Sequence, residues 1–296
     1  MSILNRSLVV SDLDGTLLRN DETISEFSVS VIKKFISKGN IFCIATGRPT
    51  RAALKYYKQL GLNTIMANLN GGILVNPSDL AFSTVNLNFS KDILKYLFSN
   101  KSLVKNIGCV FVENVDGTYL VTDGTDEFVK WEFLSKFHIG ENKEDFNLTL
   151  LKINEYEKIT KDVNSILIYI KDKKRIDEVS FKIKGLTNTL VVRNWSLPND
   201  LNGTVIEVNS IFSNKGTAVK FLSSYYTVPL SKTYSFGDGE NDLDMLSKSN
   251  GFAMRNSSHT VKLLTSKITT QTNNDDGVAT VSYTHLRAHE TGAYIV

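Results

Sequence analysis

Two aspartates stand two residues apart after an apolar run near the N-terminus. Residues 8–10 predict a short buried strand, and Asp12 and Asp14 follow it in the segment 12–16, Asp-Leu-Asp-Gly-Thr. Because side chains two apart on a strand share a face, we expect both carboxylates at one site, at the strand's carboxyl end. They repel each other unless a cation lies between them, and Mg²⁺ suits oxygen ligands. A functionless acidic turn is the alternative for this segment alone.

A second acidic segment follows another predicted strand, at residues 233–236. Residues 237–242 read Gly-Asp-Gly-Glu-Asn-Asp, so two glycines frame Asp238, and two further acids and an amide follow. This concentration of negative charge in one loop is unfavourable without a metal ion. The segment therefore predicts a metal-binding loop, with a solvated acidic turn as the alternative.

Two further segments offer groups that bind phosphate. Thr46, Gly47 and Arg48 follow the apolar run 41–45 and open a helical pattern, where a hydroxyl and backbone N–H groups suit an anion. Lys215 begins a predicted helix against the helix dipole, which suggests an anionic partner. Taken singly, these residues have ordinary alternatives: a helix cap at Thr46 and Gly47, and surface side chains at Arg48 and Lys215.

The elements around these segments alternate between strands and helices. Residues 8–10 and 41–45 predict buried strands, and the helix between them is capped by Thr23 or Ser25 and ended by Gly39. This order predicts an α/β fold, a parallel sheet with helices on both faces, and residues 65–67 are expected to supply its next strand. From about residue 83 the pattern becomes α+β. Strands are expected there at 110–112, 119–121, 166–170, 190–192 and 205–208.

We therefore expect one α/β domain in two pieces, residues 1–82 and 209–281, around a middle α+β domain at 83–208. Residues 282–296 show no clear apolar face. A foreign or misread extension in place of the native terminus is our interpretation of this atypical tail.

Composition excludes several classes of function. The 34 basic and 31 acidic residues give a net charge of +3 without long single-sign blocks, which argues against nucleic-acid and membrane partners. Two cysteines are too few for a disulfide scaffold or a cysteine-based zinc site. No apolar run reaches the ~20 residues of a membrane span, and the N-terminus lacks a signal peptide. We expect a cytoplasmic protein.

In combination, these segments resemble the haloacid dehalogenase-like (HAD) phosphatases, specifically the Cof-type group with a large cap between the second and third motifs. The resemblance covers about residues 7–281 and implies a Rossmann-like HAD core with an inserted α+β cap. The four motifs it matches are residues 12–18, 45–48, 215–216 and 237–242. Other typical stretches are 70–72, 253–256 and 276–279.

The resemblance also implies roles for individual residues. Asp12 is the expected nucleophile, which forms an aspartyl-phosphate, and Asp14 is the expected general acid and base. Mg²⁺ is the expected cofactor, held by the Asp12 carboxylate, the Asp14 backbone carbonyl and Asp238, with Asp242 close by. The expected phosphoryl-binding groups are Thr46, the Gly47 N–H, Lys215 and Asn241.

The function expected is a Mg²⁺-dependent phosphatase that hydrolyses small phosphate monoesters, either sugar phosphates or phosphorylated cofactors. The middle domain is expected to select the substrate. A phosphosugar mutase of the same superfamily is one alternative, and a phospho-accepting signalling module is another from a different class. The long insertion and the second acid at Asp14 count against the signalling module. The sequence makes no prediction about the oligomeric state.

Overall fold

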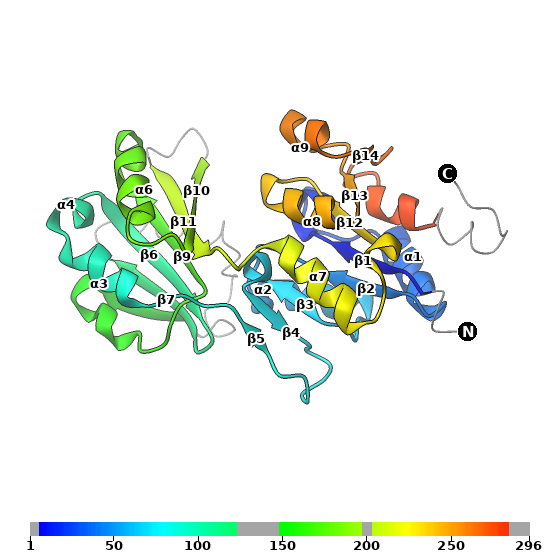
Figure 1. Cartoon of the computed structure of the whole chain (residues 1–296), viewed down its shortest axis with the longest axis horizontal. Helices are drawn as coiled ribbons and strands as arrows, with labels where there is room; N and C mark the ends of the chain where they lie inside the picture. The colour runs from blue at the N-terminus through cyan, green and yellow to red at the C-terminus, as the bar shows by residue number, and fades with distance from the viewer. Residues whose placement is uncertain (1–5, 123–147, 197–202, 284–296) are drawn as a thin grey trace. The chain divides into compact units, whose positions relative to one another are not determined.

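A computed structural model describes residues 6–122, 148–196 and 203–283 of the chain (Figure 1). The chain forms two compact units. The first, here the core unit, consists of Met1–Val85 and Asn214–Val296; the second, here the inserted unit, is Asn86–Ser213. These boundaries fall a few residues after the expected positions 82 and 208. Of the expected tail, Ser282 and Tyr283 lie in a helix that begins at residue 277, and the rest of the tail lies outside the described residues.

The core unit contains a five-stranded parallel sheet in the order β14-β13-β12-β1-β2. β1 lies between β2, from the first piece of the chain, and β12, from the second. The sheet therefore joins the two pieces into one domain. Its strands are β1 (Leu8–Ser11), β2 (Ile41–Ile44), β12 (Thr233–Gly237), β13 (Asn250–Ala253) and β14 (Lys267–Ile268).

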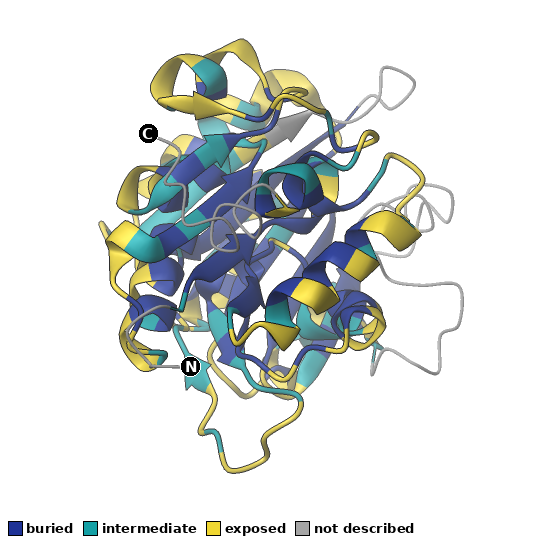
Figure 2. Cartoon of the chain, turned by 90° about the vertical axis from the view of Figure 1, so that its right-hand side faces the viewer, coloured by how far each residue is buried: buried dark blue, intermediate teal, exposed yellow. Residues whose placement is uncertain are grey.

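Helices cover both faces of this sheet, because alternate strand residues point in opposite directions. On one face, Val9 and Phe42 pack against α1 and α2, while on the other Val10 and Cys43 pack against α7. Figure 2 shows the strands buried and the outer sides of the helices exposed. The helices are α1 (Glu26–Ser37), α2 (Thr50–Leu60), α7 (Lys215–Tyr225), α8 (Leu243–Lys248) and α9 (His259–Leu264).

One expected strand belongs to a different sheet. Residues 65–67 were expected to extend the parallel sheet, but β3 (Met66–Asn68) pairs antiparallel with β4 (Ile73–Val75) in a three-stranded sheet with β5 (Val85–Asn86). A single parallel bridge, Ala45 to Ala67, still links β3 to the end of β2. The chain reverses through the short helix η3 (Leu69–Gly71), so β3 pairs with its immediate successor.

The inserted unit is an α+β module with its own hydrophobic core. Ile93, Val179 and Ile183 from its helices pack on one face of a six-stranded sheet in the order β10-β11-β9-β6-β7-β8. The strands expected at 110–112 and 119–121 pair as a hairpin, with Asn114 opposite Gly117. The strands are β6 (Ile107–Asn114), β7 (Gly117–Thr122), β8 (Leu148–Lys152), β9 (Ser165–Ile170), β10 (Leu190–Ser196) and β11 (Thr204–Ser210). The helices are α3 (Asp92–Ser99), α4 (Lys101–Val104), η5 (Ile153–Lys158), η6 (Lys173–Arg175) and α6 (Ile176–Lys184).

Across the described ranges, none of the helices combines the length and the apolar character that crossing a bilayer requires.

Candidate active site

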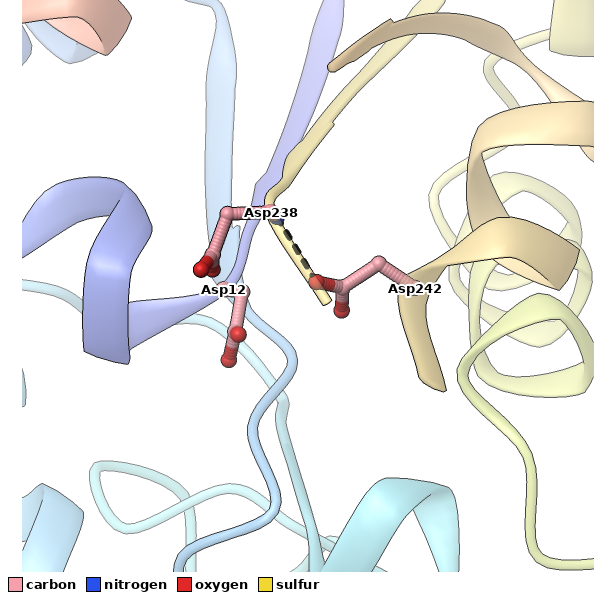
Figure 3. A group of neighbouring side chains, drawn as sticks. All are labelled: Asp12, Asp238 and Asp242. Carbon is pink, nitrogen blue, oxygen red and sulfur yellow. Dashed lines mark hydrogen bonds between the residues drawn. The ribbon is translucent and has the colours of Figure 1, made fainter. Parts of the chain in front are cut away.

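Two neighbouring strands are each followed directly by an aspartate at the same edge of the core sheet. β1 and β12 run parallel with Ser11 opposite Phe236, and Asp12 and Asp238 follow them. The Asp12 N–H donates to the Phe236 carbonyl at 3.0 Å, which continues the pairing for one residue. Oxygens of Asp12, Asp238 and Asp242 all lie within 4.8 Å of one another (Figure 3). The parallel sheet thus brings the two acidic segments together.

The loop after β1 packs directly against Asp238. Gly15 adopts a left-handed φ of 65°, and a Cβ atom there would collide with the Asp238 carboxylate. The Thr16 hydroxyl donates to Asp238 Oδ1 at 2.9 Å. Glycine at position 15 therefore satisfies both the backbone conformation and this close approach.

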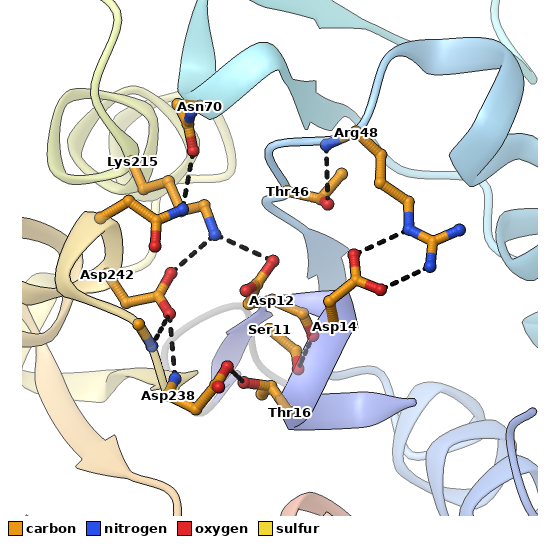
Figure 4. A network of polar contacts seen from close by, with 12 residues as sticks. Ser11, Asp12, Asp14, Thr16, Thr46, Arg48, Asn70, Lys215, Asp238 and Asp242 are labelled. Carbon is orange, nitrogen blue, oxygen red and sulfur yellow. Dashed lines mark hydrogen bonds and ion pairs between the residues drawn. The ribbon is translucent and has the colours of Figure 1, made fainter. Parts of the chain in front are cut away.

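Lys215 is completely buried and contacts two of the three carboxylates. Its Nζ lies 2.8 Å from Asp12 Oδ1 and 2.6 Å from Asp242 Oδ1 (Figure 4). The second oxygen of Asp242 accepts the N–H groups of Asp238 and Gly239, both at 2.9 Å. The position of Lys215 at a helix start suggested an anionic partner, and that partner is a pair of aspartates of the chain itself. Asp242 also fixes the loop that carries Asp238.

The cluster of three carboxylates and one ammonium has a formal charge of −3 + 1 = −2 when all four groups are ionised. Burial raises the pKa of Asp12 well above its ordinary 3.8, although Lys215 opposes this. Burial, followed by the charge of Asp242, raises the pKa of Asp238 to about 6. Burial disfavours the charged form of Lys215, but Asp12 and Asp242 outweigh it and raise the Lys215 pKa. Negative charge therefore exceeds positive charge at this site.

Asp14 points to a different partner. The strand ends at Ser11, and Asp14 lies in the following turn with φ −66° and ψ 131°, so the alternation expected from a strand does not extend to it. Its Oδ2 accepts Arg48 Nε at 2.8 Å, and Arg48 Nη2 bonds to its Oδ1. The Asp14 carboxylate thus has its own cation and lies outside the group formed by Asp12, Asp238 and Asp242.

Comparison with known proteins agrees with this geometry. A sequence model of haloacid dehalogenase-like hydrolases matches residues 9–281. The 5-amino-6-(5-phospho-D-ribitylamino)uracil phosphatase YitU of Bacillus subtilis is 32% identical over 273 residues, 92% of this chain and 94% of that protein. The crystal structure of TM0651 from Thermotoga maritima has a TM-score of 0.76 at 25% identity and covers 95% of this chain and 97% of its own. A haloacid dehalogenase-like hydrolase from Bacteroides thetaiotaomicron has a TM-score of 0.75 at 23% identity, over 95% and 100% of the two chains.

This chain belongs to the haloacid dehalogenase-like hydrolases. Within them it is a Cof-type phosphatase, that is, a phosphoric monoester hydrolase. The predicted fold, a Rossmann-like HAD core with a parallel sheet and an inserted α+β cap, is confirmed.

The acidic cluster of this HAD phosphatase fits a hard divalent cation. Its donors are carboxylate oxygens, which Mg²⁺ prefers, and its charge of −2 is what a divalent ion offsets. Burial and, after it, the neighbouring Asp242 charge raise the pKa of Asp238, and a bound cation would oppose both effects. Asp12, Asp238 and Asp242 could therefore hold such an ion.

Other groups expected to bind phosphate gather around Asn70. The Asn241 amide donates to Asn70 Oδ1 at 2.9 Å, and a Cβ atom on Gly47 would lie 3.4 Å from the same oxygen. Thr46 is fully buried, and its hydroxyl accepts the Arg48 N–H at 3.1 Å. Gly47 and Asn241, far apart in sequence, are thus neighbours through Asn70.

Two residues of this HAD phosphatase site have partners that the sequence did not predict. The sequence favours a ligand role and a surface position equally for Arg48, whereas the structure shows it 4% exposed, with Nη2 3.7 Å from Glu22 Oε1 and the guanidinium carbon 5.3 Å from the centre of the Tyr56 ring. Burial alone would lower its pKa, but the hydrogen bonds and charge of Asp14 raise it. The resemblance includes Asn70 only within the stretch 70–72, where the two glycines that follow it are the available sequence signal. In the structure Asn70 has a left-handed φ of 57°.

Proposed function

We propose that this HAD phosphatase hydrolyses small phosphate monoesters with Mg²⁺, through an aspartyl-phosphate on Asp12. The observation that carries the proposal is the position of Asp12, whose oxygen lies 2.8 Å from Lys215 within the acidic cluster. A carboxylate placed between a buried cation and a metal-binding loop suits nucleophilic attack on an anionic phosphoryl group.

In the first step, an Asp12 oxygen forms a bond to phosphorus as the ester P–O bond breaks. Asp14 gives its proton to the leaving oxygen, which departs as an alcohol. The Asp14 side chain is 49% exposed, which leaves it room to turn from Arg48 toward a substrate.

In the second step, water forms a bond to phosphorus and the bond between phosphorus and Asp12 breaks. Asp14, now ionised, takes the proton from the water, and inorganic phosphate leaves. The two Arg48 hydrogen bonds stabilise the ionised Asp14 that this step requires. Both carboxyl groups return to their starting protonation states.

The phosphoryl group is held by the Thr46 hydroxyl, the Gly47 N–H, the Lys215 ammonium and the Asn241 amide. The common position of Gly47 and Asn241 beside Asn70 supports this assignment. Each such donor is typically worth about 3 kcal/mol of barrier, because it stabilises charge that spreads over the phosphoryl oxygens.

Asp12, Asp238 and the Asp14 backbone carbonyl would hold Mg²⁺, with Asp242 beside them. The ion, when bound, supplies positive charge against the phosphoryl oxygens. Asp242 has a second task, because its bonds to the N–H groups of residues 238 and 239 fix the position of Asp238.

We propose a sugar phosphate or a phosphorylated cofactor as the substrate. The relative from Bacillus subtilis supports this class, since its name describes a phosphatase of a phosphoribitylamino uracil. The inserted unit, with its separate core, is the part that we propose selects among such esters.

The test is phosphate release from a panel of aryl, sugar and cofactor phosphates, with Mg²⁺ and with EDTA. We expect turnover that EDTA abolishes. Asp12→Asn should lower kcat by roughly a thousandfold or more, because an amide is a poor nucleophile. Asp79→Asn, an exposed acid in the same unit, is the matched control and should leave kcat unchanged. Wild-type turnover in Asp12→Asn would refute the covalent mechanism, and transfer of phosphate back to a sugar product would indicate a mutase.

A further inference from the structure

The loop that carries Asp14 is held in place by two asparagines from the C-terminal part of the core unit. The Asn256 amide donates to the Gly15 carbonyl at 2.7 Å. The Asn273 amide donates to the Leu18 carbonyl at 2.9 Å. Both bonds connect residues more than 200 positions apart in sequence, and both end on backbone carbonyls just after the proposed general acid.

The two asparagines also contact each other and the next residues of the loop. The Asn273 N–H donates to Asn256 Oδ1 at 3.0 Å, and Asn273 Nδ2 reaches Asn20 Oδ1 at 2.9 Å. The Asn20 N–H in turn donates to Asn274 Oδ1 at 2.9 Å. Asn273 is 4% exposed, whereas Asn256 is exposed. A continuous set of amide hydrogen bonds thus follows residues 15–20.

Asp276 extends this attachment toward helix α1. Its Oδ1 accepts the hydroxyls of Ser25 at 2.6 Å and Ser28 at 3.1 Å, and its Oδ2 accepts Arg19 at 3.1 Å. Glu22, which lies 3.7 Å from Arg48, belongs to the stretch between these contacts. Asp276 therefore contacts both ends of residues 19–25, the stretch that carries Glu22 beside Arg48.

The position of this loop depends on such contacts because no regular ladder fixes it. β1 ends at Ser11, and residues 13–17 form a single turn closed by the bond from the Leu18 N–H to the Leu13 carbonyl at 2.8 Å. Side-chain amides can fix the loop without adding charge, which matters beside a cluster that already carries excess negative charge.

We propose that Asn256 and Asn273 are positioning residues for the phosphatase reaction, which hold the turn so that the Asp14 carboxyl group reaches the leaving oxygen. This inference rests on the proposed function, in which Asp14 protonates the leaving group. Neither asparagine touches the substrate. Each acts through the backbone of residues 15–18.

The test compares two esters in Asn256→Ala and Asn273→Ala. One is p-nitrophenyl phosphate, whose leaving group departs without protonation, and the other is the alkyl ester that the wild type hydrolyses fastest in the panel above. The rate to compare is that of leaving-group release in the first turnover, which precedes the water step that both esters share. A displaced general acid should lower this rate for the alkyl ester by roughly tenfold, a part of what general acid catalysis contributes. For p-nitrophenyl phosphate we expect it to change by less than about twofold, since that leaving group gains little from general acid help.

Asn250→Ala is the matched control. Asn250 also donates its amide to backbone carbonyls of the core unit, at Ser231 and Thr233, but away from the loop. We expect it to change thermal stability with no difference between the two esters. If Asn273→Ala fails to fold, the exposed Asn256 decides the question alone.

A double variant separates positioning from general damage. In an Asp14→Asn background, Asn256→Ala should have no further effect on the alkyl ester, because the group it positions is already disabled. Equal losses of the first-turnover rate with both esters, or a full additional loss in the Asp14→Asn background, would overturn the inference. Failure of the proposed function looks different, since the wild type would then release no phosphate or Asp12→Asn would remain active.

Discussion

At the scale of single residues, the site depends on a buried lysine between two carboxylates. Lys215 and Asp242 have fully buried side chains, and that of Asp12 is 9% exposed. Burying three charged groups is costly, and the cost is offset only when each group has a partner of opposite charge. The same arrangement that stabilises the folded cluster leaves a cation beside the proposed nucleophile.

Replacing Lys215 tests how far its charge stabilises the two buried carboxylates. Lys215→Met should lower the free energy of unfolding by about 3–5 kcal/mol, because it leaves two buried carboxylates without their partner. Added Mg²⁺ should recover part of this loss. Lys220→Met, an exposed lysine on the same helix, should change stability by less than about 0.5 kcal/mol. Denaturant unfolding of both variants, with and without Mg²⁺, makes the comparison, and equal losses would contradict this reading of Lys215.

Asp238 predicts a pH dependence. In the folded, metal-free protein its pKa is raised to about 6 from 3.8, so the folded state binds the proton more tightly than the unfolded state. Its contribution to stability is therefore complete below 3.8 and is lost as the pH rises through about 6.

Because Mg²⁺ competes with that proton, the rise in Tm caused by Mg²⁺ should be larger above pH 6 than below it. Thermal unfolding across this range measures the effect, with Asp238→Asn as the variant that should lose it. A Mg²⁺ effect that is independent of pH would count against Asp238 as a ligand.

At the scale of elements, the site depends on the turn after β1 lying against the loop after β12. The parallel register of β1 and β12 places both loops at one edge, and Gly15 allows them to touch. The strands thus determine that the two loops lie at one edge of the sheet, and the turn at Gly15 determines that they are in contact.

Two glycine variants separate backbone strain from this contact. Gly15 and Gly39 both have left-handed φ angles, of 65° and 82°, but nothing lies within 4 Å of a Cβ atom on Gly39. Gly39→Ala should cost about 1–2 kcal/mol and leave turnover intact. Gly15→Ala should lose turnover and Mg²⁺ affinity, since its methyl group displaces Asp238. Steady-state kinetics with Mg²⁺ titration measures both, and an active Gly15→Ala would contradict the close-contact argument.

The sequence predicted these elements well where short-range signals define them. Runs of β-branched and apolar residues marked β1, β2 and β12, and Ser25 caps α1 as one of two expected residues. Contacts between segments that are distant in the sequence could not be predicted in this way. The pairing of Arg48 with Asp14, and of Asn70 with Asn241, depends on how loops approach one another after the sheet has formed. No periodicity or composition carries that information.

At the scale of the whole molecule, each unit has its own hydrophobic core. Phe42 and Phe236 belong to the core unit, and Ile166 and Ile206 to the inserted unit. The acidic cluster, Lys215 and the Asp14–Arg48 pair all belong to the core unit. Binding of a metal ion should therefore stabilise one unit directly.

Calorimetry tests this division. We expect two unfolding transitions in the intact chain, one for each core, and Mg²⁺ should raise the temperature of only one of them. Asp238→Asn should abolish that shift and leave the other transition unchanged. Equal shifts of both transitions would contradict the assignment of the metal site to the core unit alone.

The most direct test of the central claim is to trap the phosphorylated enzyme. Protein mixed with substrate and Mg²⁺ is quenched in acid within one turnover, digested, and examined by mass spectrometry. The account predicts a phosphoryl group on Asp12 in the wild type and none in Asp12→Asn. Turnover without phosphorylation of Asp12, or phosphorylation at another residue, would contradict it.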